Sequence, residues 1–390
     1  MGPRTILVRA RDLEVRLGDS DDVRISRGDV HVQTTTHALN VLAAFTHPRA
    51  LGEVLDGAVA GSQDWIELSS AVHQLAKAGI LIEPGTPDTV PRGYAQPPIH
   101  VAMLDDHART RGFIDALRAL VREDDTVLDI GTGTGVLATV AALAGAARVT
   151  AVESSAIADV AERIFATNGV GDRVTLVRGR STNVTLPERC SLLVTEMIGN
   201  DPLDERLLDI VDDAKKRLLT PDARLIPSAI EIFAVPVDLP RRVYERRAFT
   251  PDRLAAWKQM YGVDFSTLAS GHRGHSEWFS MRTSEVVTWP RVSPPLSLAA
   301  IDLTRPFDLS FGRQVTFQPE RDVERLGIVL AFRATLAPGI VLSTLPDEVD
   351  PDNHWRYALW PSAGRPAFGR GTTVTLDYAH ERGITKLSIS

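Results

Sequence analysis

Hydrophobic positions divide the chain into three stretches with different spacing. Residues 1–90 hold short alternating runs and then apolar residues at helical spacing, such as Leu51 and Val54. Residues 99–235 alternate buried-type strands with amphipathic helices, and residues 236–390 consist largely of alternating apolar runs between turn residues. The pattern predicts a small α+β unit, then a mostly parallel α/β sheet, then an all-β barrel or sandwich.

Local patterns predict the individual elements of each stretch. The first is expected to hold strands at residues 5–8, 13–17, 22–25 and 81–84 and helices at 37–45, 48–59 and 64–80. The second is expected to hold strands at 126–131, 148–154, 173–179 and 191–196 and helices at 108–121, 135–146 and 157–169. The third is expected to hold strands at 231–237, 307–311, 328–336, 339–344 and 373–378 and one isolated helix at 251–262. A linker at 91–98 closes a proline-rich stretch after the first unit, whose order of strands and helices is typical of a winged-helix-like domain.

Composition narrows the classes of protein. The 390 residues are 44% hydrophobic and 24% charged, which is typical of a soluble globular protein with two or three domains. A net charge of −7 without a Lys/Arg-rich run argues against nucleic-acid binding. The lone Cys190 offers no disulfide framework, and no apolar run reaches the ~18 residues of a membrane span. We therefore expect a cytoplasmic protein that binds neither membrane nor nucleic acid.

A glycine-rich turn, VLDIGTGTG at residues 127–135, follows the first strand of the α/β stretch. Glycines there let the backbone approach a ligand and open a helix whose N-terminus is electropositive. Glu153 ends the next strand, where a carboxylate can bind both ribose hydroxyls. NAD also fits this geometry, but the acidic residue that opens the turn, Asp129, favours S-adenosylmethionine.

Two glutamates, Glu196 and Glu205, follow the fourth strand with a separation of nine residues, in VTEMIGNDPLDE. His100 and His107 lack a third ligand at usable spacing, so we expect no metal site. Two carboxylates beside a nucleoside site and away from any metal point to a bound cation. The pair predicts that a positively charged group is held in front of the nucleoside.

The glycine-rich turn, Glu153 and the paired glutamates together resemble the motifs of the protein arginine N-methyltransferases. These are class I S-adenosylmethionine-dependent enzymes. TEMIGNDPLDE is similar to that family's double-glutamate loop, and residues 99–110 to its helix over the cofactor. Residues 257–268 resemble its dimerisation arm, expected near 250–275, and residues 352–355 its Thr-His-Trp loop. The resemblance implies a Rossmann-like cofactor domain at 99–235, followed by a β-barrel substrate domain at 236–390. It also implies a homodimer that methylates arginine in a protein or peptide.

The resemblance implies a role for each matched residue. Glu196 and Glu205 would grip the guanidinium as catalytic residues together with His354, which would pair with Asp106. Met103, Asp106 and Trp355 would shape the acceptor side. The residues implied in cofactor binding are His100, Arg109, Asp129, Gly131, Gly133, Gly135, Glu153, Ser154 and Thr182.

Departures from the family pattern leave alternatives for the acceptor. The aromatic helix expected before residue 99 is missing, Met197 replaces a tryptophan, and Asp201 to Asp204 replace aromatic residues of the loop. Such a slot also suits another peptide residue or a small-molecule amine of secondary metabolism, and a cofactor-binding scaffold without activity is the remaining alternative. Residues 1–90 resemble peptide-recognition domains of enzymes that modify ribosomally made peptides, which implies a role in binding a peptide or partner.

Overall fold

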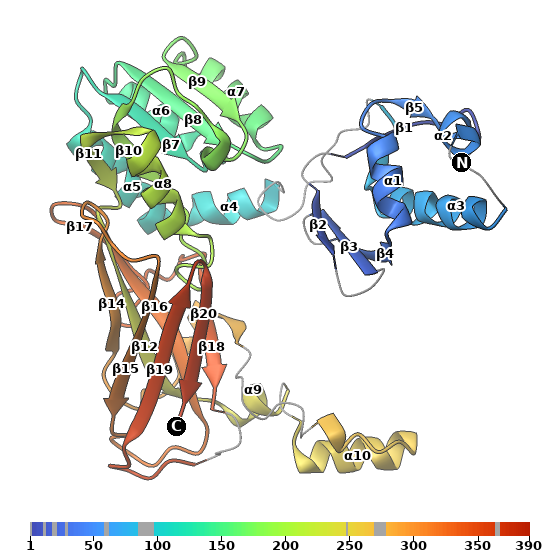
Figure 1. Cartoon of the computed structure of the whole chain (residues 1–390). Coiled ribbons are helices and arrows are strands. Elements are labelled where there is room, and N and C mark those ends of the chain that lie inside the picture. The colour runs from blue at the N-terminus through green and yellow to red at the C-terminus, as the bar shows by residue number, and fades with distance from the viewer. Residues whose placement is uncertain are drawn as a thin grey trace. The chain divides into compact units, whose positions relative to one another are not determined.

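A computed structural model of the chain forms two compact units, Met1–Gln96 and Pro97–Ser390 (Figure 1). Most of the predicted linker and the predicted arm beyond residue 268 lie outside the described residues. The structure describes residues 2–10, 13–17, 22–27, 30–57, 62–84, 97–246, 249–268, 278–362 and 367–390.

The first unit combines helices with two small antiparallel sheets, ordered β5-β1-β6 and β2-β3-β4. Its own core buries Val41, Leu75 and Ile80 completely. The hairpin strand β4 lies where the sequence predicts no element, because its residues VHVQTT mix apolar and polar side chains. The bounds are β1 Ile6–Arg9, β2 Glu14–Leu17, β3 Asp22–Arg27, β4 Val30–Thr35, α1 His37–Ala44, β5 Arg49–Ala50, α2 Leu51–Gly57, α3 Ser62–Lys77 and β6 Leu81–Ile82.

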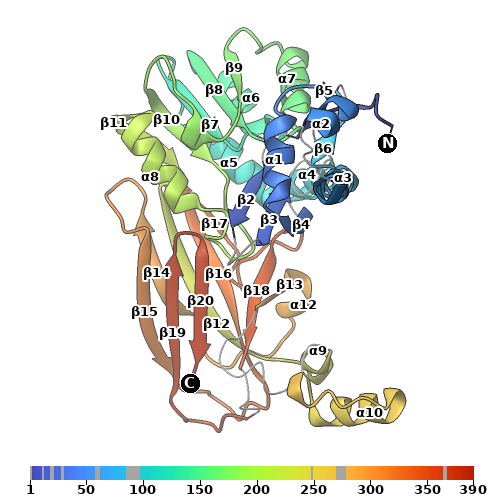
Figure 2. The same ribbon diagram turned by 45° about the vertical axis from the view of Figure 1, so that its right-hand side comes forward.

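The second unit begins with a five-stranded parallel sheet, ordered β11-β10-β7-β8-β9 and flanked by helices (Figure 2). Because parallel strands end at one edge, Gly131 after β7, Glu153 at the end of β8 and Glu196 after β10 lie on the same side of the sheet. The strands are β7 Thr126–Ile130, β8 Arg148–Glu153, β9 Val174–Arg178, β10 Cys190–Thr195 and β11 Leu219–Ile226. The helices are α4 Pro97–Asp105, α5 His107–Leu120, α6 Val136–Leu143, α7 Ala158–Thr167, α8 Leu207–Arg217 and the 3₁₀ helix Ser181–Asn183.

Strand β11 is a second element that the sequence pattern does not predict. It carries Pro221 and a polar centre, which argue against a strand. The strand tolerates proline because it lies at the edge of the sheet and its pairing with β10 is irregular between Cys190 and Leu192. The positions of the other four strands in this sheet thus follow hydrophobicity, whereas that of β11 does not.

Two antiparallel sheets form the rest of the second unit. The first has the order β13-β18-β16-β12-β14, with β17 paired to β16, and the second has the order β15-β19-β20. One core runs through both halves, since Leu128 and Leu193 of the parallel sheet share it with Leu330 and Phe332 of β16. The strands are β12 Ala229–Asp238, β13 Phe279–Arg282, β14 Leu296–Asp302, β15 Ser310–Phe317, β16 Leu326–Ala337, β17 Ile340–Ser343, β18 Arg356–Pro361, β19 Val374–Glu381 and β20 Ile384–Ile389.

The prediction of a single helix within this part is wrong. Besides α10 Pro251–Tyr261, the short helices α9 Arg241–Glu245 and α12 Thr283–Val286 interrupt the strands. Both are too short to produce a helical periodicity that a sequence pattern can reveal. None of the helices in the described part of the chain has the length and the apolar run that a bilayer crossing requires.

Helix α10 projects from the strand-rich part at the end far from the parallel sheet, as Figures 1 and 2 both show. It buries none of its residues, and Met260 and Tyr261 are more than 60% exposed. The ring of Phe265 packs edge-on against Trp257 and Tyr261, which gives the segment an aromatic cluster of its own. The helix therefore offers an apolar surface that the described residues leave uncovered.

Candidate active site

The glycine-rich turn between β7 and α6 holds three glycines in the left-handed region, at φ 76° for Gly131, 56° for Gly133 and 84° for Gly135. A Cβ on Gly131 would lie 2.7 Å from the Met197 sulfur, and one on Gly135 would collide with the ring of Phe165. A side chain is therefore excluded at Gly131 and Gly135 by conformation and by space. The backbone stays bare for a ligand.

Asp129 lies completely buried beneath this turn. Its Oδ2 accepts hydrogen bonds from the Thr132 hydroxyl at 2.6 Å and the Ala138 N–H at 3.0 Å. Its Oδ1 has no partner among the described residues. Burial raises the pKa of Asp129 to about 7, with a smaller contribution from the charge of Glu153, although the two hydrogen bonds lower it. The site thus contains a carboxyl that binds a proton close to neutral pH.

Glu153 is held by backbone N–H groups at the end of β8. Its Oε2 accepts a hydrogen bond from Gly133 at 3.0 Å, and its Oε1 accepts one from Ser155 at 2.7 Å. These bonds orient the carboxylate and leave lone pairs for hydroxyl donors of a ligand. His100 of α4 reaches the same turn, because a Cβ on Gly133 would lie 3.4 Å from its ring. The structure therefore brings His100 and Glu153 to the turn from two separate elements.

Two other predicted cofactor residues are exposed. Ser154 follows β8 directly, and Thr182 lies in the 3₁₀ helix after β9. They belong to the same carboxyl edge of the sheet, since β8 and β9 pair in parallel from Val149 to Glu153. Their side chains lie at the rim of this edge rather than in its buried part.

Arg109 and Glu196 form a buried ion pair. The Arg109 Nε donates to Glu196 Oε2 at 3.0 Å, and its Nη2 binds the same oxygen more closely. A third donor of Arg109, Nη1, reaches the carbonyl of Met103 at 3.2 Å. The first predicted acceptor carboxylate thus already holds a guanidinium, that of the arginine predicted to bind the cofactor.

Asp106 joins α5 to the strand-rich half. Its Oδ1 caps α5 by accepting the Arg109 N–H at 3.0 Å. Its Oδ2 accepts the backbone N–H and the ring Nδ1–H of His354, at 3.0 and 2.8 Å. Burial raises the pKa of Asp106, but the bonds from His354 and Arg109 outweigh it and leave the pKa below its usual value. The helix predicted over residues 99–110 consequently breaks at Asp106 into α4 and α5.

Trp355 closes the junction from the side of the strands. The side chain is 5% exposed, and its Nε1–H donates to the carbonyl of Ile198 at 2.6 Å. Its ring meets Phe332 edge-on at 5.1 Å and lies 4.2 Å from the ring of His354. Trp355 therefore fixes the start of the loop that carries both glutamates, hereafter the acceptor loop, residues 196–206.

Glu205 lies at the far end of the acceptor loop and is half-buried. Between the two glutamates, Asp201 is 2% exposed, and burial raises its pKa to about 6 although the nearby hydroxyl of Thr385 lowers it. Sequence reasoning treated Asp201 as a loop acid and missed its burial. Thr385 lies on β20, so no local pattern around Asp201 could have revealed it.

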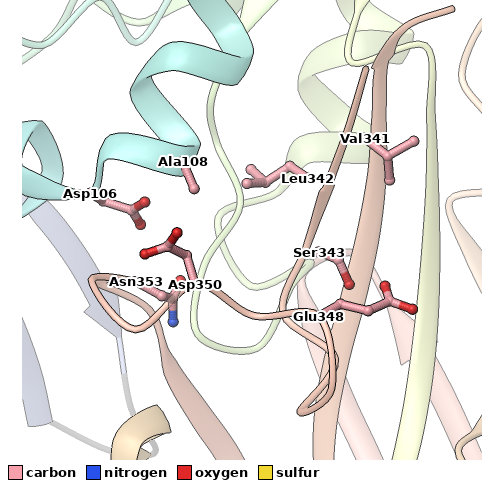
Figure 3. Close-up of a pocket in the computed structure, with 8 residues that line it drawn as sticks. All are labelled: Asp106, Ala108, Val341, Leu342, Ser343, Glu348, Asp350 and Asn353. Atoms are coloured by element: carbon pink, nitrogen blue, oxygen red, sulfur yellow. The ribbon is translucent and has the colours of Figure 1, made fainter. Parts of the chain in front are cut away.

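A cavity of about 270 Å³ opens beside Asp106 (Figure 3). The carboxylates of Asp106 and Asp350 point toward each other in it, with Ala108 and Leu342 at one end. Asp106 thus contributes to the domain junction and to a hollow with an acidic wall. The lining residues are Asp106, Ala108, Val341, Leu342, Ser343, Glu348, Asp350 and Asn353.

Comparisons with known proteins match this chain to methyltransferases. A family model described as ribosomal protein L11 methyltransferase (PrmA) matches residues 105–231. The chain is 30% identical over 289 residues to the arginine N(omega)-methyltransferase of Streptomyces achromogenes subsp. streptozoticus, covering 71% of this chain and 74% of that protein. It is 32% identical over 206 residues to the probable protein arginine N-methyltransferase 6 of Arabidopsis thaliana, covering 51% and 46%. The chain spans about half the length of several curated relatives that it matches.

Solved structures confirm the predicted fold class of a Rossmann-like domain followed by a β-barrel. A Trypanosoma brucei PRMT1 enzyme-prozyme heterotetrameric complex with AdoHcy superimposes with a TM-score of 0.63 at 24% identity, over 76% of this chain and 94% of that one. Arabidopsis thaliana protein arginine methyltransferase 10 gives 0.60 at 20% identity, over 76% and 98%. At these identities the likeness concerns the fold.

The raised pKa of Asp129 predicts how stability depends on pH. The ordinary pKa of 3.8 applies to the unfolded chain and about 7 to the folded one, so between these values the folded chain binds more protons. The free energy of unfolding therefore falls as pH rises, by roughly 2–3 kcal/mol from pH 5 to pH 8 for this group alone. Asp129→Asn should flatten this dependence by that amount, measured by denaturant unfolding of the ligand-free protein. Parallel pH profiles of the two proteins would contradict the assignment.

Proposed function

This chain belongs to the arginine N-methyltransferase family, and from that premise we propose that it methylates a guanidinium nitrogen with S-adenosylmethionine as donor. The observation that carries the proposal is Glu196, a buried carboxylate that already binds the guanidinium of Arg109 through two of its nitrogens. The Oε1 of Glu196 accepts the N–H of Ile198 at 3.4 Å, and because a carboxylate has about four lone-pair sites, the same oxygen can still bind a second guanidinium beside that of Arg109. We propose an arginine in a protein or peptide as the acceptor.

The residues at the carboxyl edge of the sheet fit the proposed cofactor. The bare backbone of Gly131 and Gly133 and the anchored carboxylate of Glu153 provide contacts of the kind that a nucleoside and an amino-acid tail require. Arg109 provides a cation for a carboxylate. When bound, S-adenosylmethionine supplies a methyl group attached to a positively charged sulfur.

The acceptor loop is proposed to prepare the nucleophile. A guanidinium is a weak nucleophile because its lone pairs are delocalised and it stays protonated in water. Glu196 and Glu205, held at two ends of one loop, would localise charge on one nitrogen and orient it. Orientation can supply much of the rate, and the proton can leave after methyl transfer, so a strong base is not needed. His354 would act by holding Asp106, and through it α5, in place.

A second candidate acceptor is a small molecule, free arginine. It is favoured by the similarity to the Streptomyces relative, which is named an arginine rather than a protein arginine methyltransferase and which matches most of both chains. Mass spectrometry separates the candidates, since it shows whether free arginine or a peptide gains methyl groups and at which nitrogen. A protein that binds the cofactor and methylates neither would be the scaffold considered above.

We propose the cytoplasm as the location of this protein, since the single cysteine gives no disulfide framework.

The cofactor assignment predicts a charge-dependent affinity. Calorimetry with S-adenosylhomocysteine should show binding that Glu153→Ala weakens by ~1–3 kcal/mol, because charged hydrogen bonds are lost. Glu188→Ala is the matched control, since Glu188 is an exposed acid paired with Arg148. Tight binding of NAD without binding of S-adenosylhomocysteine would refute the proposal.

The acceptor assignment predicts a loss of turnover with cofactor binding preserved. Glu196→Gln keeps the shape of the side chain and removes the charge that polarises the guanidinium. Turnover should fall by roughly a hundredfold or more, which corresponds to ~2.7 kcal/mol in the barrier. The affinity for S-adenosylhomocysteine should change little. Normal methylation of arginine by this variant would exclude the guanidinium clamp.

We propose that the exposed face of α10 mediates a homodimer. The apolar side chains Met260 and Tyr261 at its surface support this, since a monomer would leave them in water. Light scattering should give a dimer for the native chain and a monomer for Met260→Glu/Tyr261→Glu. Val341→Glu, at a residue that is 54% exposed on β17, should leave the mass unchanged. A native monomer at micromolar concentration would rule out the dimer.

We propose that residues 1–90 bind a peptide or partner segment at a distance from the chemistry. Support comes from the separate core of this unit, around Val41 and Leu75. Binding at a second site raises the effective concentration of a long substrate without altering the acceptor slot. Deletion of residues 1–90 should lower activity on a long substrate and spare a short arginine peptide. Equal losses on both would indicate a lid or a folding role instead.

A further inference from the structure

The acceptor loop rests on the turn of the hairpin formed by β19 and β20. A Cβ on Gly383, in this turn, would lie 2.8 Å from Cγ of Arg206 and 3.6 Å from the carbonyl oxygen of Asp204. Gly383 itself has φ 85°, a conformation that suits glycine. The two residues that flank Glu205 therefore both touch this turn.

Arg206 has an uncommon backbone conformation for a residue with a side chain. Its φ of 64° lies in the left-handed region, which costs a non-glycine residue about 1 kcal/mol or more. Arg206 also precedes α8 directly and binds Asp209 through Nη2 at 3.0 Å. Such a conformation persists only where the surroundings impose it, and the stem of Arg206 is packed against Gly383.

A buried polar cluster lies beneath the middle of the loop. The carboxyl of Asp201 faces the hydroxyl of Thr385 on β20, and the hydroxyl of Tyr378 on β19 faces both. Asp201 and Tyr378 are each 2% exposed. Within the described residues, none of the three oxygens Asp201 Oδ1, Thr385 Oγ1 and Tyr378 Oη has a hydrogen bond of regular geometry. A second contact, polar and away from water, thus joins loop and hairpin.

Contacts of His380 stabilise the β19–β20 hairpin close to its turn. His380 pairs with Thr385 across the two strands, and its Nε2 accepts the N–H of Gly383 at 3.2 Å. The His380 ring packs on Phe311 of β15 at 5.5 Å and faces the carboxylate of Asp209 on α8. The turn that supports Arg206 is therefore fixed from its own sheet and from the helix that follows the loop.

We propose that the β19–β20 hairpin positions Glu205 for catalysis, with Arg206 and Asp201 as positioning residues. The inference rests on the proposed function, in which Glu205 binds the acceptor guanidinium. Glu205 lies between the left-handed Arg206 and the buried Asp201, so its carboxylate is directed by contacts at both sides. An error of 1 Å in such a group costs up to about a hundredfold in rate.

The test uses substitutions that relieve strain or conserve shape. Arg206→Gly suits φ 64° and loses an exposed ion pair and the contact of the arginine stem with Gly383, so the melting temperature should change little while the support of the loop is removed. Thr385→Val removes the hydroxyl that faces Asp201 and keeps the volume. Both variants should exchange amide hydrogens faster in residues 199–206 and lower kcat on the acceptor by about tenfold. Their affinity for S-adenosylhomocysteine should not change.

Arg382→Gly is the matched control, because Arg382 is an exposed residue of the same turn with φ 47°. It should leave both hydrogen exchange in the loop and kcat unchanged. Unaltered exchange in Arg206→Gly and Thr385→Val, or faster exchange with normal kcat, would overturn the inference. An inactive native enzyme would refute the proposed function alone, while hydrogen exchange, which needs no turnover, would still show whether the hairpin orders the loop.

Discussion

The carboxylate of Asp106 is the contact on which the arrangement of the second unit depends. It is 1% exposed, and a buried charge is stable only if its oxygens are hydrogen-bonded. One oxygen caps α5 and the other binds His354 twice, so the same group sets where the helix begins and where the loop after β17 ends. The start of α5 in turn places Arg109 within reach of Glu196. A carboxylate shared by two halves of a unit aligns them more narrowly than their common apolar core can, because apolar contact has little directional preference.

The ion pair of Arg109 and Glu196 illustrates what such alignment is used for. Burying two charges contributes little to stability, since the loss of hydration offsets most of their attraction. The pair matters for geometry: Glu196 Oε2 binds two nitrogens of Arg109, and Oε1, which also accepts the N–H of Ile198, faces the proposed acceptor. Below the turn, Asp129 differs from Glu196 because it has no cation beside it among the described residues. Its burial instead raises its pKa to about 7, so that it binds a proton near neutral pH. Charged and neutral carboxyls thus lie on the same edge of one sheet.

Much of the fold and part of the candidate site could be predicted from the sequence, because they depend on local patterns. The strand–turn–helix around Gly131, the strand that ends at Glu153 and the paired glutamates need only neighbouring residues to be recognised. The edge strand β11 with Pro221, the break of the helix at Asp106 and the burial of Asp201 could not be foreseen. Each depends on a partner far along the chain: on β10 for the strand, on His354 for the break and on the β19–β20 hairpin for Asp201. Hydrophobic periodicity contains no information about such partners.

The order of these partners along the chain has a consequence for biosynthesis. The parallel sheet with its glycine-rich turn is complete by β11, whereas His354, Trp355 and the strands β19 and β20 are translated much later. During synthesis from the N-terminus, the strands of the parallel sheet are therefore available before the supports of the acceptor loop have been made. A ribosome-bound chain would pass through a stage in which the glycine-rich turn is present, while Asp106 still lacks His354 and Ile198 still lacks Trp355. Because Asp106 and the acceptor loop depend on residues that are translated late, methyl transfer would have to wait until the strand-rich half has folded.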